Sequence, residues 1–305
     1  MTFLTQQLVN GLTLGSVYAL IALGYSMVYG ILKLLNFAHG EVYMAGAFIG
    51  YGVLTVLGGA ADPAIAVPLL IVAMFLAAML GCGLLGVAIE RFAYRPLRDA
   101  PRIAPLISAL GVSFFLQSSA LLLFTARFRS YDTPRLISFR TGLDVGPLRI
   151  SLVRILVILT AVALMAGLSA LVGRSRLGRA IRATAFDREA AAMMGVDVDR
   201  VIVATFFIGS ALAGAGGVMF GLVFSNVYHL MGFTAGLKGF TAAVVGGIGS
   251  VPGAMLGGLL IGLGEAFAAG YISSTFQDLI VFLILVAVML LRPRGLLGAA
   301  AIDKV

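Results

Sequence analysis

Residues 174–200 read RSRLGRAIRATAFDREAAAMMGVDVDR, and this charge-dense segment divides a chain that is otherwise almost continuously apolar. It separates an apolar span that ends near Val172 from one that starts near Val201. Each ionised side chain at the centre of a bilayer costs about 2.5–3.5 kcal/mol on insertion scales, so the segment cannot lie in hydrocarbon. We therefore expect a helical loop at a membrane surface, between two groups of membrane helices.

The composition assigns the rest of the chain to the membrane. Of its 305 residues, 61% are hydrophobic and 11% are charged, and the mean hydropathy is +1.08. A helix needs about 20 apolar residues to cross a bilayer, so the pattern predicts an all-α, polytopic transmembrane bundle of about eight helices. We treat residues 1–305 as a single transmembrane domain that contains the loop 174–200. The apolar stretches run over 1–32, 42–61, 63–89, 103–126, 155–173, 201–237, 239–264 and 266–291.

The charged and reactive residues argue against several classes of function. The net charge of +8 comes mostly from arginines near the ends of apolar spans, which indicates topology control and contact with anionic lipid, not nucleic-acid binding. Cys82 is the only cysteine and no histidine pair has ligand spacing, so we expect no metal site. No lysine follows a glycine, so a Walker A motif is absent and the chain should not hydrolyse nucleotide by itself. No grouping of Ser, His and Asp argues for an enzyme.

The arginines also predict which loops share a side of the membrane. The loops 91–102 and 174–200 carry four and six arginines and are separated by two predicted helices, which places both in the cytoplasm. The segment 127–154 must then face outward, although it also carries six arginines. Its Asp, Gly and Pro residues predict a small ordered external loop or hairpin.

A count of crossings predicts that one apolar stretch is broken. Two arginines in the C-terminal tail favour a cytoplasmic end, which needs an even number of crossings after the loop 174–200, yet only three long stretches follow that loop. The best place for the break is 246–253, because glycine and proline end helices and the freed backbone groups must then line protein or a cavity. Close helix packing or a simple turn would explain the same sequence. Because broken helices build transport paths, the candidate path residues here are Gly246, Gly247 and Gly249.

Glycine pairs at a spacing of four residues indicate helices that pack closely. They predict a compact bundle and carry no information about a substrate. The pairs are Gly11 and Gly15, Gly46 and Gly50, Gly217 and Gly221, Gly253 and Gly257, and Gly258 and Gly262.

Polar residues between the first two apolar stretches are further candidates for the transport path. Asn36, His39 and Glu41 fall in YGILKLLNFAHGEVYMAG, where the chain near 31–41 would be broken or re-entrant. They form either a polar break that shapes the path or its gate, or an ordinary interfacial loop in which Lys33 reaches the surface. Spacing alone favours the interfacial loop and leaves the path reading open.

Two acidic residues lie in the C-terminal third. Glu265 follows a long apolar run, so it either caps a helix at the interface, pairs inside the bundle or lies on the transport path. Asp278 is read as the start of a helix or an interfacial residue. Glu265 is therefore kept as a candidate path residue.

Long stretches of this chain resemble one known family. They are LVNGLTLGSVYALIALGYSMVYGILKLLNFAHGEVYMAGAF at 8–48, FTAAVVGGIGSVPGAMLGGLLIGLGEAF at 240–267 and RPRGLLG at 292–298. This combination resembles the permease subunits of branched-chain amino-acid ABC importers, and the resemblance covers nearly the whole chain. It implies a multi-pass protein of the bacterial inner (plasma) membrane.

The resemblance also gives the charged loop a role. The sequence REAAAMMG is similar to the EAA-x3-G core with which such permeases dock on an ATP-binding subunit, although the downstream I-x-L-P portion is absent. Small alanines permit close docking, glycine allows a turn and charges set the register. The resemblance thus implies a cytoplasmic coupling loop at 174–200. Its coupling residues would be Asp187, Arg188, Glu189, Ala190, Ala191 and Gly195.

The partners follow from the same resemblance. It implies two ATP-binding cassette subunits that bind the ATP and Mg, with no cofactor in this chain. It also implies a second permease subunit, as a heterodimer or a homodimer, and an extracytoplasmic substrate-binding protein. The expected cargo is leucine, isoleucine, valine or a related amino acid.

Other functions remain open at this stage. Close relatives of the family carry urea and short amides, and a permease sequence says little about its cargo. An autonomous channel or secondary transporter would move solute through the purified chain alone. A membrane enzyme would need a reactive group of residues that the sequence does not contain.

Overall fold

The structure, a computed structural model, describes residues 2–58, 67–98, 100–101, 103–131, 142–145 and 148–298. Eight of the described helical segments are long and apolar enough to cross a membrane, which confirms the predicted all-α, polytopic bundle. The third continues from α3 into η1 (Glu90–Tyr94) and η2 (Arg95–Leu97), and η3 (Ser274–Phe276) precedes the last. The long helices are α1 (Thr2–Leu32), α2 (His39–Gly58), α3 (Val67–Ile89), α4 (Ile103–Phe124), α6 (Leu152–Arg174), α9 (Val198–Phe224), α11 (Val251–Tyr271) and α12 (Gln277–Leu291).

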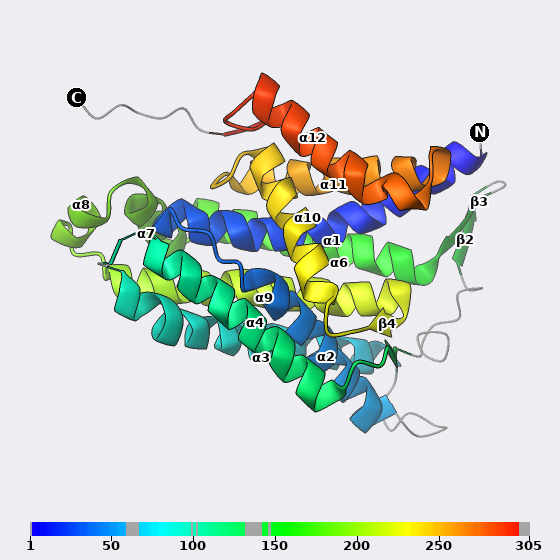
Figure 1. The fold of residues 1–305 in the computed structure, drawn as a ribbon, viewed down its shortest axis with the longest axis horizontal. Helices are drawn as coiled ribbons and strands as arrows, with labels where there is room; N and C mark the ends of the chain where they lie inside the picture. The colour runs from blue at the N-terminus through cyan, green and yellow to red at the C-terminus, as the bar shows by residue number, and fades with distance from the viewer. Residues whose placement is uncertain are drawn as a thin grey trace.

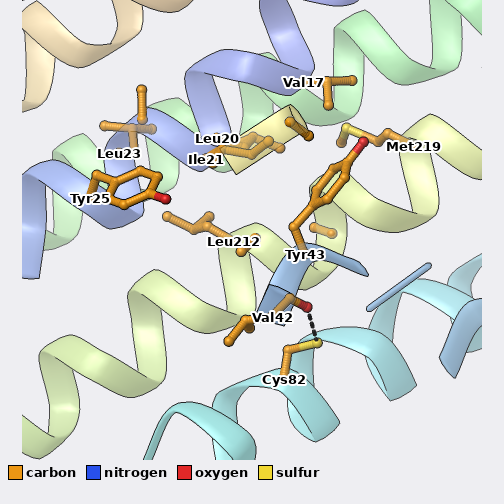
Figure 2. Close-up of a cluster of buried hydrophobic side chains, with 14 of the residues drawn as sticks. Val17, Leu20, Ile21, Leu23, Tyr25, Val42, Tyr43, Cys82, Leu212 and Met219 are labelled. Atoms are coloured by element: carbon orange, nitrogen blue, oxygen red, sulfur yellow. Dashed lines mark hydrogen bonds between the residues drawn. The ribbon is translucent and has the colours of Figure 1, made fainter. Parts of the chain in front are cut away.

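Helix α1 lies in the middle of the bundle. It is apolar on all sides, as expected of a helix enclosed by others, and it packs against α11, α9, α6 and the shorter α10 (Met231–Gly246). Figure 2 shows Leu20 of α1 near Leu212 of α9 and Tyr43 of α2. On the far side of α2, Cys82 of α3 donates a hydrogen bond to the Val42 carbonyl oxygen at 3.3 Å. The single cysteine is therefore a buried packing residue.

Two glycines show how closely these helices approach one another. A Cβ atom added to Gly15 of α1 would lie 2.8 Å from Cα of Leu259 in α11. One added to Gly46 of α2 would lie 2.5 Å from Cα of Gly214 in α9. Neither position has room for a larger residue, which confirms the close packing predicted from these glycine pairs.

The two ends of the bundle differ in structure (Figure 1). One end, here the hairpin end, carries β1 (Arg129–Ser130) paired antiparallel with β4 (Asn226–Val227), and β2 (Gly142–Val145) paired antiparallel with β3 (Leu148–Ser151). The opposite end, here the loop end, carries the loop 174–200. The hairpin predicted within 127–154 is thus confirmed, and it lies at the end opposite that loop. Residues 132–141 and 146–147 of this segment fall outside the described residues.

The predicted break near 31–41 is present between the first two helices. Helix α1 ends at Leu32, and Lys33 has a left-handed backbone with φ of 55°. Helix α2 begins only at His39. The chain therefore turns within the bundle before α2 starts.

The predicted break at 246–253 is present as well. Helix α10 ends at Gly246, and α11 begins at Val251 with Ser250 as its N-cap. Gly247 and Gly249 have φ of 109° and 90°, a conformation that residues with a side chain rarely adopt. The break was predicted correctly from the sequence because the turn itself requires glycine, and glycine is visible in the sequence.

One predicted stretch is wrong. The apolar run 201–237 is not continuous, because α9 ends at Phe224, Ser225 has φ of 58° and α10 begins at Met231. Uncharged residues at 225–230 conceal this break from a count of charges. Four helices therefore follow the loop 174–200, and the tail returns to the loop end, where the Leu296 N–H donates to the Val245 carbonyl oxygen at 2.9 Å.

Candidate functional site

The loop 174–200 forms an ordered arm at the loop end, made of α7 (Arg176–Phe186) and α8 (Arg188–Met193). The Ser175 hydroxyl oxygen begins α7 by accepting a hydrogen bond from the Gly178 N–H at 2.9 Å. Ile181 and Thr184 are buried against the bundle, while the arginines of α7 are exposed. The arm is amphipathic and lies on the protein as a surface helix does.

The first turn of α8 is capped by Asp187. Its Oδ1 atom accepts hydrogen bonds from the N–H groups of Glu189 at 3.0 Å and Ala190 at 3.1 Å. These N–H groups have no partner inside the helix, so the cap sets where α8 begins.

Gly195 closes the other end of α8. It has φ of 82°, and its N–H donates to the Ala192 carbonyl oxygen at 3.0 Å. The next N–H, of Val196, donates to the carbonyl oxygen of the buried Ala191, also at 3.0 Å. This pair of hydrogen bonds is a Schellman motif, in which the left-handed position favours glycine. The predicted docking glycine therefore has a structural reason to be glycine.

The outer side of the arm carries an apolar tip, formed by Phe186, Met193 and Met194. Their side chains are 69%, 88% and 84% exposed. Glu189 and Ala190 are also exposed, on the same short helix. Apolar groups gathered on an otherwise hydrophilic arm are typical of a protein contact, and methionine adapts to a partner's shape.

Arg188 joins the arm to the end of α1. Its Nε and Nη2 atoms donate to the Ile31 carbonyl oxygen at 3.0 and 2.5 Å. This carbonyl belongs to the last turn of α1, where carbonyl groups lack helical partners. The bond therefore attaches α8 to α1 directly before the break at Lys33.

A pocket of about 490 Å³ lies between the arm, the end of α1 and the start of α4, and several cationic side chains line it. Burial lowers the pKa of Arg188, and the nearby Arg98 adds to the effect. Burial also lowers the pKa of Lys33, with a further contribution from Arg188. The arm thus lies over a pocket in which Lys33, Arg98 and Arg188 come close together, beside Asp187 and Glu189.

A second attachment joins the start of α9, directly after the arm, to the segment 90–98 that continues α3. Arg95 forms an ion pair with Asp199 at 2.7 Å, and Arg98 forms ion pairs with both Asp199 and the buried Glu90. Asp199 lies in the first turn of α9, directly after the arm. The sequence did not indicate this network, because Asp199 is 104 positions from Arg95 and 101 from Arg98 and each residue resembles an ordinary interfacial charge.

Asn36, His39 and Glu41 are buried inside the bundle, with exposed fractions of 2%, 1% and 1%. An ordinary interfacial loop would leave them in contact with water, so this alternative is wrong. The Tyr94 hydroxyl donates to Oδ1 of Asn36 at 3.3 Å, and the Ser113 hydroxyl donates to Oε1 of Glu41 at 3.4 Å. All three residues are buried at the break between α1 and α2 and are here called the inner polar cluster, although each contacts a different element: Asn36 contacts Tyr94 of η1, His39 packs against Tyr25 of α1, and Glu41 lies next to Gly232 of α10.

Glu265 lies elsewhere and pairs inside the bundle. Its Oε1 atom is 2.7 Å from Nζ of Lys238, which is also 2.7 Å from Oδ1 of Asp278. Lys238 and Glu265 are 6% and 5% exposed. The cluster joins α10, α11 and the start of α12. Lys238 was not among the predicted site residues. It is the only charged residue between 201 and 264, and this isolation was a signal in the sequence that could have found it.

The three candidate glycines lie at the loop end, apart from both polar groups. They form the turn between α10 and α11, where the Leu297 N–H donates to the Gly246 carbonyl oxygen at 2.9 Å. Gly249 also lies next to Gly30 of α1. The predicted path residues therefore lie in three regions, and Asn36, His39 and Glu41 share one of them, the break between α1 and the start of α2. Among the residues described here, no group of three His, Cys, Asp or Glu side chains is arranged to hold a metal ion.

The family model and the sequence relatives agree on one family. Residues 7–289 match the family model described as branched-chain amino acid transport system / permease component. The chain is 46% identical over 301 residues to the high-affinity branched-chain amino acid transport system permease protein BraD of Pseudomonas aeruginosa, covering 98% of this chain and 97% of that protein. It is 42% identical over 308 residues to the corresponding protein LivH of Escherichia coli, covering 99% and 98%. A solved structure, PsaBC from Streptococcus pneumoniae in complex with Fab, covers 96% of this chain and 93% of that chain at 13% identity, with a TM-score of 0.49.

Proposed function

The chain belongs to the family of branched-chain amino acid transport permeases, and from this premise we propose that it forms a membrane pathway driven by separate ATPase subunits. It is a multi-pass protein of the inner membrane and a permease subunit of a transport system. The energy for transport would come from ATP and Mg bound by two ATP-binding cassette subunits. This chain would contribute no ATPase site and no cofactor.

The apolar tip of the arm is the observation that carries this proposal. Phe186 at the end of α7 and Met193 and Met194 at the end of α8 are exposed, and Arg188 in the first turn of α8 bonds to the Ile31 carbonyl oxygen at the end of α1. A partner bound to the tip would pull on Ile31, which lies directly before the break at Lys33. The inner polar cluster begins at this break. The ion pairs of Asp199 would pass the same motion to α3 and α9. The arm is thus built to transmit a movement, as a coupling loop must.

The remaining partners are assigned to the two ends and the sides of the bundle. A second permease subunit would complete the pathway, as a heterodimer with a related chain. A substrate-binding protein would dock at the hairpin end, and lipid would cover the apolar sides that remain. Leu122 and Leu290, which are 83% and 79% exposed, illustrate how apolar those sides are.

The proposed cargo is leucine, isoleucine or valine. The named relatives are described as high-affinity branched-chain amino acid permease proteins, and the family description uses the same words. A permease of urea or short amides is the second candidate, because the described residues form no side-chain pocket diagnostic of one cargo. Uptake of labelled leucine by cells that express the complete transport system should be competed by isoleucine and valine and not by urea. Competition by urea alone would contradict the assigned cargo.

The inner polar cluster is proposed as part of the pathway, and the other candidate residues receive other roles. Glu265 would hold α10 to α11 through Lys238. The glycine turn at 246–249 would let α10 and α11 bend relative to each other. Asn36, His39 and Glu41 would meet the cargo or gate its passage, because buried polar groups inside a membrane protein mark substrate paths.

A substitution in the apolar tip tests the coupling proposal. Met193→Asp should reduce leucine uptake about tenfold or more, because an interface anchor typically contributes about 2 kcal/mol. Co-purification of the ATP-binding subunits with the permease should fall in parallel, while the amount of inserted permease stays unchanged. The matched control is Arg179→Gln, which changes the charge of the arm by the same amount at an exposed site outside the tip. Normal uptake and normal co-purification in Met193→Asp would remove the arm from the ATPase contact.

A further inference from the structure

The bundle encloses two carboxylates with opposite surroundings. Glu265 is 5% exposed and lies 2.7 Å from the ammonium group of Lys238. Glu41 is 1% exposed, and the one hydrogen bond that its carboxylate accepts from the described residues is the long one from the Ser113 hydroxyl at 3.4 Å. Among the described residues, none places a cation within ion-pair distance of Glu41. One buried carboxylate therefore has its counter-ion and the other does not.

The other two side chains of the inner polar cluster also have a buried atom without a partner. Oε2 of Glu41, Nε2 of His39 and Nδ2 of Asn36 are all buried without a hydrogen-bond partner among the described residues. Leaving buried polar groups unpaired is costly, most of all for a charge, so such groups are expected to gain partners in some state of the protein. The inner polar cluster thus has an unfilled acceptor on Glu41 and an unfilled donor on Asn36.

The chain approaches Glu41 closely with glycine backbone. A Cβ atom added to Gly232 would collide with the Glu41 carboxylate, and one added to Gly40 would lie 2.9 Å from Cα of Gly236. Gly232 belongs to the first turn of α10, where helix N–H groups have no helical partner and the helix dipole is positive. The Glu41 carboxylate therefore packs directly against the first turn of α10, where Gly232 has no side chain to separate the two.

Helix α4 covers this group. Ala109 and Ser113 face inward and are buried, whereas Phe114 and Phe115 on the outer side are 63% and 68% exposed. The helix packs against α2 and η1, and its Ser108 hydroxyl donates to the Ala93 carbonyl oxygen at 3.0 Å. Of all the helices around the cluster, α4 is the one with the fewest residues buried inside the bundle, so its displacement would disturb the core least.

We propose that Glu41 binds the ammonium group of a zwitterionic amino acid during transport, while Asn36 and the first turn of α10 face its carboxylate, and that α4 is the cover that moves aside. The inference rests on the proposed function and names the contact that the pathway makes with its cargo. A zwitterion supplies the cation that Glu41 lacks and the acceptor that Asn36 lacks. Glu265, which already has Lys238, takes no part.

Uptake by variants of Glu41 is the first test. Glu41→Gln keeps the shape of the side chain and should reduce leucine uptake by the complete system at least about tenfold, because the charge that holds the ammonium group is gone. Glu41→Asp should retain part of the activity. Thr160→Ala in α6 is the control: it removes a hydroxyl that donates to the Leu156 carbonyl oxygen at 2.8 Å, outside the inner polar cluster, and should leave uptake within about twofold of the wild type. Normal uptake in Glu41→Gln would overturn the proposal, since a neutral buried acid would tolerate the amide.

Protection of a cysteine gives a direct readout in the complete complex. Ala109→Cys, combined with Cys82→Ala, places a thiol on the inward-facing side of α4. Ser274→Cys, at an exposed position of the hairpin end, serves as the control. During ATP turnover a small polar thiol reagent should label residue 109. Leucine should slow this labelling. 4-Methylpentanoate, which is leucine without its ammonium group, should not slow it. In the Glu41→Gln variant, leucine should no longer protect residue 109. Labelling of residue 274 should not change.

The outcomes separate this inference from the proposed function. Equal protection by leucine and 4-methylpentanoate, protection that survives Glu41→Gln, or no labelling of residue 109 in any state would each overturn the role of Glu41 and α4. Each of these results is interpretable only while the wild-type complex takes up leucine. If the wild-type complex takes up no leucine, the proposed function itself fails. The comparison of the two ligands uses wild-type Glu41 and so remains decisive even if Glu41→Gln does not fold.

Discussion

The arm at the loop end and the Lys238 cluster inside the bundle both concentrate charge, but they use it in opposite ways. In the arm, Glu189 and the arginines of α7 are exposed, and the fold is held by caps and hydrogen bonds to backbone carbonyls. In the cluster, Lys238 and Glu265 are almost fully enclosed and depend on each other. Exposed charge is free to select a partner, whereas enclosed charge must be neutralised for the chain to fold. Substitutions in the two regions should therefore fail in different ways.

The largest expected effect is on folding, from Lys238→Met. The change leaves Glu265 buried without a cation beside Asp278, and breaking a buried ion pair from one side costs about 3–5 kcal/mol. The yield of folded protein after detergent extraction and its melting temperature should both fall. Lys238→Met combined with Glu265→Met should restore much of the loss, because no buried charge is then left unpaired. A single variant as stable as the wild type would show that the cluster does not stabilise the bundle.

The second prediction separates transmission from folding. Arg188→Gln removes the charged bond from the arm to the Ile31 carbonyl oxygen and should lower leucine uptake about tenfold, while the ATP-binding subunits still co-purify and hydrolyse ATP. The matched control is Arg182→Gln, because Arg182 bonds only to carbonyl groups next to the arm itself, including that of Gly173 at 3.3 Å. Equal uptake in both variants would argue against a mechanical link between α8 and α1.

A smaller effect is expected at the end of α8. Gly195→Val places a β-branched residue at φ of 82° and should cost about 1–2 kcal/mol locally, enough to unwind the last turn and displace Met193. Uptake should fall and protease cleavage within the arm should speed up. Gly173→Ala, at a helical glycine with open space around it, is the control and should be neutral. Unchanged protease sensitivity in Gly195→Val would contradict the structural role of this glycine.

The smallest effect concerns the cap of α8. Asp187→Ala removes the acceptor for two N–H groups and should cost about 1 kcal/mol, whereas Asp187→Ser should recover most of it. Hydrogen exchange of the Glu189 and Ala190 amides should speed up in the alanine variant, with little change in the melting temperature of the bundle. Slow exchange at both amides in Asp187→Ala would mean that another group caps the helix.

The sequence predicted the features that depend on local chemistry. The apolar stretches gave the membrane helices, and the turn at 246–249 followed from glycines that adopt left-handed backbone. The break at 225–230 was missed because uncharged residues such as Ser225 do not interrupt an apolar run. The bonds from Arg188 to Ile31 and from Arg98 to Asp199 join segments more than 100 positions apart, and no local pattern indicates such pairs. The burial of Glu41 was likewise undetermined, because it depends on α4 and α10 covering the break.

The most direct test of the account is leucine flux into proteoliposomes that contain this chain alone, compared with flux when the ATP-binding subunits, the second permease and the substrate-binding protein are added with ATP. The account predicts no leucine-specific flux from the chain alone and ATP-dependent flux from the assembled system. Leucine flux through the isolated chain, equal with and without ATP, would contradict it.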